Sequence, residues 1–215
     1  MTATVFGATG LVGSVLIEQL INDKRFTTIK AIVRKKGVFD DAKIIEVETD
    51  FSKSLNNTVN TGQEIYFCCL GTTLKKAGSK NAQQIVDRDY PIEIAKQAEA
   101  LGVNKMICVS SVGADSSSNN FYLKTKGEME VGVASHMHAN AIFVRPSMIL
   151  GDRKEKRIGE KIGKVFMTFL NPLFVGSLKK YKSIDAHDIA QAMIYAAFNN
   201  VSNIMDYEMM IQVKN

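Results

Sequence analysis

The chain has 215 residues, which is enough for one domain with a full apolar core but too few for two large domains. Hydrophobic residues make up 46% of the chain and charged residues 23%, and this ordinary usage excludes a disordered or fibrous protein. The formal charge of +5 is mild and the basic residues are scattered, so we expect small anionic ligands rather than a nucleic acid.

Three features bear on where the protein works. The first residues already have the pattern of a strand, so no leader peptide is expected, and no apolar run is long enough to cross a bilayer. Cys68, Cys69 and Cys108 fall on apolar strand-like segments, and their odd number does not suggest a disulfide framework. We therefore expect a cytoplasmic protein without a membrane span.

Short β-branched apolar runs alternate with amphipathic stretches along the chain. Strands are predicted at 2–6, 29–33, 43–47, 64–70, 105–110, 141–144 and 207–213. Helices are predicted at 11–22, 82–101, 121–135, 159–170 and 187–198. This alternation predicts an α/β fold: a single doubly wound parallel sheet, Rossmann-like, with helices on both faces. We expect one NAD(P)-binding domain over 1–215, with 146–215 contributing a small substrate-side region.

A glycine-rich turn follows the first predicted strand. Glycine allows the tight turn at Gly7, close approach of a pyrophosphate at Gly10, and close packing of helix on strand at Gly13. In the first βα turn of a doubly wound sheet this pattern indicates dinucleotide binding, the alternative being a purely structural turn. The residues predicted to contact the cofactor here are Gly7, Thr9, Gly10, Leu11, Val12 and Gly13.

The end of the second strand distinguishes between the two nicotinamide cofactors. NAD sites usually carry an acidic residue here, whereas this chain has Arg34, Lys35 and Lys36. A guanidinium can bind a 2′-phosphate through a bidentate interaction, so NADP(H) is favoured. Arg34 and Lys35 are predicted to bind that phosphate. The alternative is an exposed basic turn without a ligand.

A Ser, Tyr and Lys set follows the fifth strand. Ser111 would stand at the carboxyl edge of the sheet, while Tyr122 and Lys126 are four residues apart on the next predicted helix and share a face. The ammonium would favour the phenolate, and Ser111 could hold a substrate carbonyl beside the phenol. We therefore predict these three as catalytic residues, the alternative being a surface tyrosine among solvated lysines.

With these motifs the chain resembles an atypical, extended-like short-chain dehydrogenase/reductase, and more narrowly the Tat-interactive-protein oxidoreductase-like branch. The matching stretches are FCCLGTT (67–73), KAG (76–78), VDRDY (86–90), SSVGADSSSNNFYLKTKGEME (110–130), RP (145–146) and DRKEKRIGE (152–160). The resemblance implies a Rossmann fold, NADP(H) binding and the Ser–Tyr–Lys roles above. It also implies that cofactor contacts come from Asp50, Phe51, Leu70, Gly71, Thr72, Tyr122, Lys126, Arg145 and Pro146.

Three functions are weighed. The first is an NADP(H)-dependent oxidoreductase that transfers hydride to or from a small carbonyl or alcohol, with Tyr122 as the acid or base. The second is a catalytically weak NADP(H)-binding sensor with a regulatory protein partner, and the third is a nucleotide-sugar epimerase or dehydratase. A monomer and a homodimer are both compatible with the sequence. We expect no metal site, since His136 and His138 are two residues apart and lack neighbouring ligands at metal-binding spacing.

Overall fold

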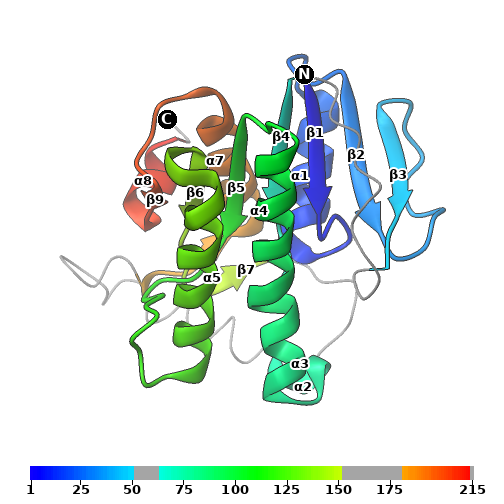
Figure 1. The fold of residues 1–215 in the computed structure, drawn as a ribbon. Coiled ribbons are helices and arrows are strands. Elements are labelled where there is room, and N and C mark those ends of the chain that lie inside the picture. The colour runs from blue at the N-terminus through cyan, green and yellow to red at the C-terminus, as the bar shows by residue number, and fades with distance from the viewer. Residues whose placement is uncertain (51–62, 152–180, 214–215) are drawn as a thin grey trace.

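A computed structural model describes residues 1–50, 63–151 and 181–213, and it contains a twisted parallel sheet with helices on both sides (Figure 1). The main sheet has seven strands in the order β3-β2-β1-β4-β5-β6-β9, and all of its pairings are parallel. Its strands are β1 (Thr2–Phe6), β2 (Thr28–Val33), β3 (Ile44–Glu48), β4 (Glu64–Cys68), β5 (Lys105–Val109), β6 (Ala141–Val144) and β9 (Ile204–Met205). A separate parallel pair joins β7 (Ile149–Leu150) to β8 (Ile184–Asp185). The predicted fold class is confirmed.

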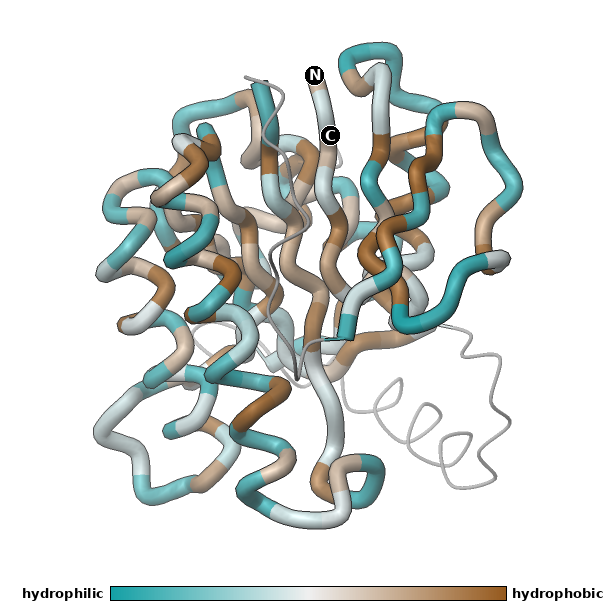
Figure 2. Tube along the Cα trace, turned by 45° about the vertical axis from the view of Figure 1, so that its right-hand side comes forward, coloured by the Kyte–Doolittle hydropathy of each residue, from teal (hydrophilic) through white to brown (hydrophobic). Residues whose placement is uncertain are grey.

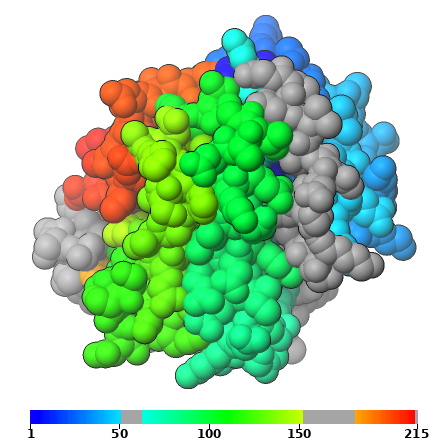
Figure 3. All heavy atoms as spheres, viewed as in Figure 1, coloured from blue at the N-terminus to red at the C-terminus, as the bar shows by residue number. Residues whose placement is uncertain are grey.

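Each face of the sheet is covered by a pair of helices. α1 (Leu11–Asn22) packs beside α7 (Ala186–Phe198) on one face. α4 (Tyr90–Ala100) and α5 (Phe121–Met137) lie side by side on the other, where they form one continuous surface (Figures 1 and 3). The short α-helices among the described residues are α2 (Leu74–Ala77), α3 (Lys80–Gln84) and α8 (Tyr207–Gln212).

The strand order reverses between β1 and β4, which are neighbours in space although β2 and β3 separate them in the chain. β1 leads into α1 on one face, whereas β4 leads through α2 and α3 into α4 on the other. The loops after β1 and β4 therefore diverge at the lower edge of the sheet in Figure 1. In doubly wound sheets, ligands bind at the carboxyl edge beside this point of divergence.

The strands separate two apolar clusters because successive side chains point to opposite faces. Ala3 and Val5 on β1 belong to the cluster under α1 and α7, and Phe6 belongs to the one under α4 and α5. Figure 2 shows the apolar strands at the centre and hydrophilic residues along the outer surfaces of the helices. Both faces of the central strands are buried, which explains their nearly continuous apolar sequences.

The prediction of a strand at 207–213 is wrong. This segment begins with the helix α8, capped by Asp206, whose side chain accepts a hydrogen bond from the Met209 amide at 3.0 Å. The last strand, β9, lies just before it and pairs with β6. An aspartate cap followed by Glu, Met and Gln favours a helical turn over a strand, and that local signal outweighs the short apolar run.

The helix predicted at 82–101 is interrupted rather than continuous. α3 runs into a π-helical turn at Ile85–Asp89, and α4 starts only at Tyr90. The wide turn contains the buried carboxylate of Asp87. The helix predicted at 187–198 is confirmed as α7, with Asp185 as its cap, and the helix predicted at 159–170 lies outside the described residues.

Candidate active site

The glycine turn packs against the loop that follows β4. Gly7 has φ +79°, and a Cβ placed on it would lie 2.7 Å from the carbonyl oxygen of Cys69. A Cβ on Gly13 would lie 2.1 Å from the Gly7 oxygen, so both positions require glycine. The Gly10 amide donates to the Gly7 oxygen at 2.9 Å and closes the turn.

The start of α1 is open toward the carboxyl edge. Gly10 is the N-cap residue and is exposed together with Thr9, and no side chain within the described residues caps this end of the helix. Leu11 is half-buried, whereas Val12 is buried. Uncapped amides and the positive end of the helix dipole fit an anionic diphosphate, so this part of the chain fits the expected cofactor.

Register brings the other predicted cofactor loops to the same edge. Phe6 on β1 lies opposite Ile32 on β2 and Cys68 on β4. The chain therefore leaves the sheet at neighbouring points just beyond these residues. On β2 this point is followed by Arg34, Lys35 and Lys36, all of which are exposed.

The loop after β4 is held by a carboxylate. Asp87 is fully buried, and its Oδ1 accepts a hydrogen bond from the Thr72 amide at 2.8 Å. Its Oδ2 accepts from the Gln83 amide group at 3.1 Å, and a Cβ on Gly71 would lie 3.4 Å from Oδ1. Leu70 is half-buried beside this loop. Asp87 was not among the predicted site residues, although the VDRDY stretch that carries the family resemblance contains it.

Ser111 and Lys126 lie at the end of β5. Ser111 is 8% exposed, and its hydroxyl donates to the Val112 oxygen at 3.3 Å. Lys126 is only 3% exposed, and its Nζ donates to the carbonyl oxygen of Val109, the last residue of β5, at 3.3 Å. A buried ammonium facing a strand end is unusual for a lysine without a role, since burial of charge is costly.

Tyr122 lies one turn before Lys126 on α5. Asn120 caps this helix by accepting hydrogen bonds from the amides of Tyr122 and Leu123 at 3.0 and 3.1 Å. Tyr122 is 38% exposed, in contrast to the buried lysine. The first turn of α5 thus leaves the tyrosine partly accessible to solvent.

A glycine on α5 admits the loop that precedes the helix. A Cβ on Gly127 would lie 2.2 Å from backbone atoms of Asp115 and Ser116. The Asp115 amide also donates to the Leu123 oxygen at 3.1 Å. The loop between Ser111 and Tyr122 is therefore folded back onto the helix, a contact that the sequence pattern alone did not indicate.

Arg145 braces β6 against α5. Its guanidinium pairs with both carboxylate oxygens of Glu130, and this contact raises the pKa of Arg145. Glu130 also accepts a hydrogen bond from the Ser110 hydroxyl. The carbonyl of Pro146 accepts from the Val112 amide at 2.9 Å, which joins the loop after β6 to the loop after β5. Arg145 was predicted to contact the cofactor, and its guanidinium is paired with Glu130.

The three thiols are free, and they pack around the ends of β4 and β5. Cys68 and Cys108 are buried and lie opposite one another on the two strands. Burial raises the pKa of the Cys69 thiol far above its usual value, and a hydrogen bond with Cys68 raises the pKa of Cys108. The same hydrogen bond lowers the pKa of Cys68, and the three thiols lie on or just beyond central strands, where cysteine packs as a small apolar group.

Asp50 and Phe51, the predicted contacts beyond β3, differ in whether the structure describes them. Asp50 is exposed just beyond β3, and Phe51 lies outside the described residues. Within the residues that the structure describes, no group of three metal-binding side chains is present. No helix in this part of the chain is long and apolar enough to cross a membrane.

Taken together, a glycine turn that opens an uncapped helix, at the point where a doubly wound parallel sheet reverses its order, defines a dinucleotide-binding Rossmann domain. Comparison with known proteins gives the family. The chain belongs to the NAD(P)H-binding family, whose model matches residues 7–200.

Relatives in sequence agree with this assignment. The chain is similar to the protein HTATIP2 of Rattus norvegicus, with 36% identity over 167 residues that cover 75% of this chain and 68% of the relative. It is also similar to the mitochondrial protein FMP52 of Coccidioides immitis, with 31% identity over 209 residues that cover 91% and 85% of the two chains. The expected resemblance to the Tat-interactive-protein branch is confirmed.

Solved structures share the fold at low identity. A Bacillus cereus UDP-glucuronic acid 4-epimerase superposes with a TM-score of 0.70 and 12% identity, covering 95% of this chain and 76% of the epimerase. The oxidoreductase ylbE from Lactococcus lactis superposes with a TM-score of 0.65 and 16% identity, covering 93% and 86%. At such identities the likeness concerns the fold alone.

Proposed function

We propose that this protein is an NADP(H)-dependent oxidoreductase of the short-chain dehydrogenase/reductase type, acting on a small carbonyl or alcohol. The observation that carries the proposal is the buried Lys126 ammonium at the end of β5, one helical turn from Tyr122. An ammonium in this place supports proton transfer by a nearby phenol. The NAD(P)H-binding family supports the cofactor class.

The cofactor would lie along the carboxyl edge. The amides of the Gly7–Gly13 turn would hold the diphosphate, and Arg34 and Lys35 the 2′-phosphate. Gly71 and Thr72 would line the nicotinamide side. Further residues proposed to contact the cofactor are Thr9, Leu11, Val12, Asp50, Phe51, Leu70 and the backbone of Arg145 and Pro146.

The chain's own residues would then handle the substrate and the proton. When bound, the cofactor supplies or accepts the hydride. Ser111 would hold the substrate oxygen by a hydrogen bond, and Tyr122 would donate its hydroxyl proton to that oxygen during reduction. Lys126 would stabilise the resulting phenolate, and the same groups would run in reverse during oxidation.

Turnover that depends on the phenol tests this function. We expect Tyr122→Phe to lower kcat for NADPH-dependent reduction by about 10²–10⁴-fold, because the proton donor is lost while the ring remains. The measurement is NADPH consumption over a panel of small aldehydes and ketones, with wild type, Tyr122→Phe and, as a matched control, Tyr195→Phe on α7. Equal activity of Tyr122→Phe and wild type on every substrate would contradict the proposal.

A catalytically weak NADP(H) sensor is the second candidate. It is favoured by the Ser111 hydroxyl, which is directed to the Val112 oxygen, and by the exposure of the Tyr122 ring. NADPH binding without turnover on the panel, together with cofactor-dependent capture of a protein partner, would support it. Nucleotide-sugar epimerisation is the third candidate and is tested by incubating the protein with UDP-glucose and UDP-glucuronic acid.

We also propose that the protein works in the cytoplasm. The three free thiols packed beside the site support this, because thiols stay reduced in that compartment. The fungal relatives carry the word mitochondrial in their names, so a fluorescent fusion examined against a mitochondrial marker tests this part. Light scattering on the purified chain distinguishes a monomer from a homodimer, both of which the sequence allows.

A further inference from the structure

A single carboxylate holds the loop that follows β2. The side chain of Glu46, on β3, accepts hydrogen bonds from three consecutive backbone amides. Its Oε2 accepts from Gly37 at 2.5 Å, and its Oε1 accepts from Val38 and Phe39 at 2.8 Å each. Gly37 has φ +89°, a left-handed conformation that glycine adopts readily.

These bonds determine the path of the crossover from β2 to β3. α1 forms the crossover from β1 to β2, but residues 34–43 contain no helix, so few internal bonds hold this segment. Charge-assisted bonds to backbone amides are among the stronger hydrogen bonds in proteins. They hold the pKa of Glu46 below its usual range, with the Gly37 amide as the largest cause, so the carboxylate is ionised at neutral pH.

The held loop starts immediately after the basic segment. Arg34, Lys35 and Lys36 are exposed between Val33, the last residue of β2, and Gly37, the first residue bonded to Glu46. Val33 itself accepts a hydrogen bond from the Thr49 amide at 2.9 Å. The basic segment is therefore fixed at both ends, beside the strand that carries the glycine turn.

We propose that Glu46 is a specificity-determining positioning residue that holds the basic segment where it meets the 2′-phosphate of NADP(H). This inference rests on the proposed function. Glu46 itself does not contact the cofactor. It acts through the backbone of residues 37–39, and its loss leaves the three cations attached to a loosened loop.

A purely electrostatic role for Glu46 predicts the opposite change in NADPH affinity, so the two roles can be distinguished. Glu46→Gln removes a negative charge close to the basic segment, so a purely Coulombic role would tighten NADPH binding. A positioning role predicts weaker NADPH binding. In glutamine only one of the two side-chain positions is still an oxygen acceptor, and the NH₂ group at the other position faces a backbone N–H group that it cannot accept from.

The experiment compares dissociation constants for NADPH and NADH among wild type, Glu46→Gln and Glu48→Gln. Glu48 is exposed on the same strand and makes none of these amide contacts, so it is matched for charge. We expect Glu46→Gln to weaken NADPH binding roughly tenfold and to leave NADH within about twofold. We expect Glu48→Gln to leave NADPH unchanged or slightly tighter.

Two results would overturn the inference: NADPH binding by Glu46→Gln as tight as by wild type, or an equal loss of NADH binding. Wild type that fails to prefer NADPH would instead overturn the NADP(H) proposal itself, and the inference with it. Trypsin gives a readout without cofactor. Cleavage after Arg34, Lys35 or Lys36 in the folded protein should be several-fold faster in Glu46→Gln than in Glu48→Gln, and equal rates would contradict a loosened loop.

Discussion

Asp87 and Glu46 use the same device at two loops of the carboxyl edge. Each carboxylate comes from an element later in the chain and accepts hydrogen bonds from the backbone of a loop that leaves the sheet, from the Thr72 amide at Asp87 and from three amides at Glu46. The Asp87 carboxylate is fully buried within a π-helical turn, a wide turn often found at functional sites. The Thr72 loop is thus bonded to the π-helical turn that directly precedes α4.

Asp87→Ala should affect both nicotinamide cofactors equally. The substitution removes the acceptor of the Thr72 amide and leaves the Gln83 side chain only its 3.4 Å bond to the Thr72 carbonyl, so we expect a loss of about 1–3 kcal/mol in unfolding free energy. NADPH and NADH binding should weaken to the same degree, unlike in Glu46→Gln. Denaturant titration and cofactor titration measure the two effects.

Asp87→Asn is the matched control. Its remaining oxygen can accept from Thr72, and the Gln83 amide can flip to accept from the new Nδ2. It should retain most of the stability and binding that Asp87→Ala loses. A variant ranking in which Asn is as damaging as Ala would show that the negative charge, rather than the loop contact, is what matters.

Among the elements, α5 contains two glycines with different surroundings. A Cβ on Gly127 would meet the backbone of the 115–116 loop at 2.2 Å, whereas a Cβ on Gly132 would meet the Ile92 side-chain end at 2.3 Å. A backbone cannot yield as a flexible side chain can. Gly127→Ala should therefore cost about 1–3 kcal/mol or more, and Gly132→Ala about 1 kcal/mol or less, since alanine also favours the helix.

Thermal unfolding of the two α5 variants checks this difference, and kcat on any substrate of the wild type adds a second measurement. Because the displaced loop joins Ser111 to Tyr122, Gly127→Ala should also lower turnover. If both variants are equally stable and equally active, the packing of this loop on α5 is not important for either property.

The elements that were predicted correctly are those with a local apolar pattern. α1, β1 and β6 match their predicted bounds, because an apolar helical stripe or a short continuous apolar run is a signal contained in the segment itself. The interruption at 85–89 could not be predicted, since nothing in the local sequence shows that Asp87 accepts a hydrogen bond from a loop fifteen residues earlier. The roles of Glu46 and Glu130 were missed for the same reason: their partners come together only when the sheet forms.

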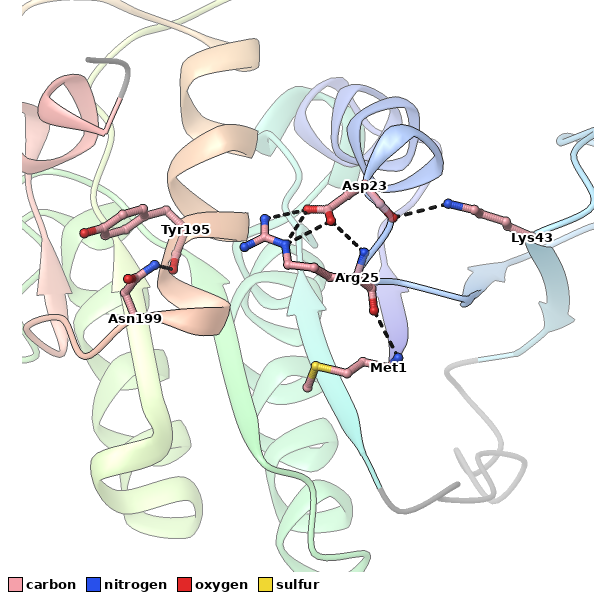
Figure 4. Close-up of polar contacts among 6 residues, drawn as sticks. All are labelled: Met1, Asp23, Arg25, Lys43, Tyr195 and Asn199. Atoms are coloured by element: carbon pink, nitrogen blue, oxygen red, sulfur yellow. Dashed lines mark hydrogen bonds and ion pairs between the residues drawn. The ribbon is translucent and has the colours of Figure 1, made fainter.

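At the scale of the whole molecule, the carboxyl and amino edges of the sheet carry different groups of residues. The carboxyl edge carries the candidate site, whereas the opposite edge carries a polar brace (Figure 4). There Asp23 pairs with Arg25, Lys43 donates to the Asp23 carbonyl, and the Arg25 guanidinium lies 3.9 Å from the ring centre of Phe198. The brace connects the end of α1 to β3 and to the end of α7, so variants here should change stability without changing cofactor binding.

Asp23→Asn tests this separation through pH. The hydrogen bond from Arg25 lowers the pKa of Asp23 below its unfolded value, so its stabilising contribution is present above the unfolded pKa and is lost as pH falls through the folded pKa. Because Arg25 is half exposed, solvent screening limits the contribution to no more than about 1 kcal/mol. Urea unfolding should therefore show Asp23→Asn less stable than wild type at pH 7, with the gap closing as the pH falls below the usual aspartate pKa and through the lowered one, while NADPH affinity at pH 7 stays the same. A gap that persists unchanged at low pH would mean that the pair stabilises the protein by packing rather than by charge, and weaker NADPH binding would mean that the two edges are coupled.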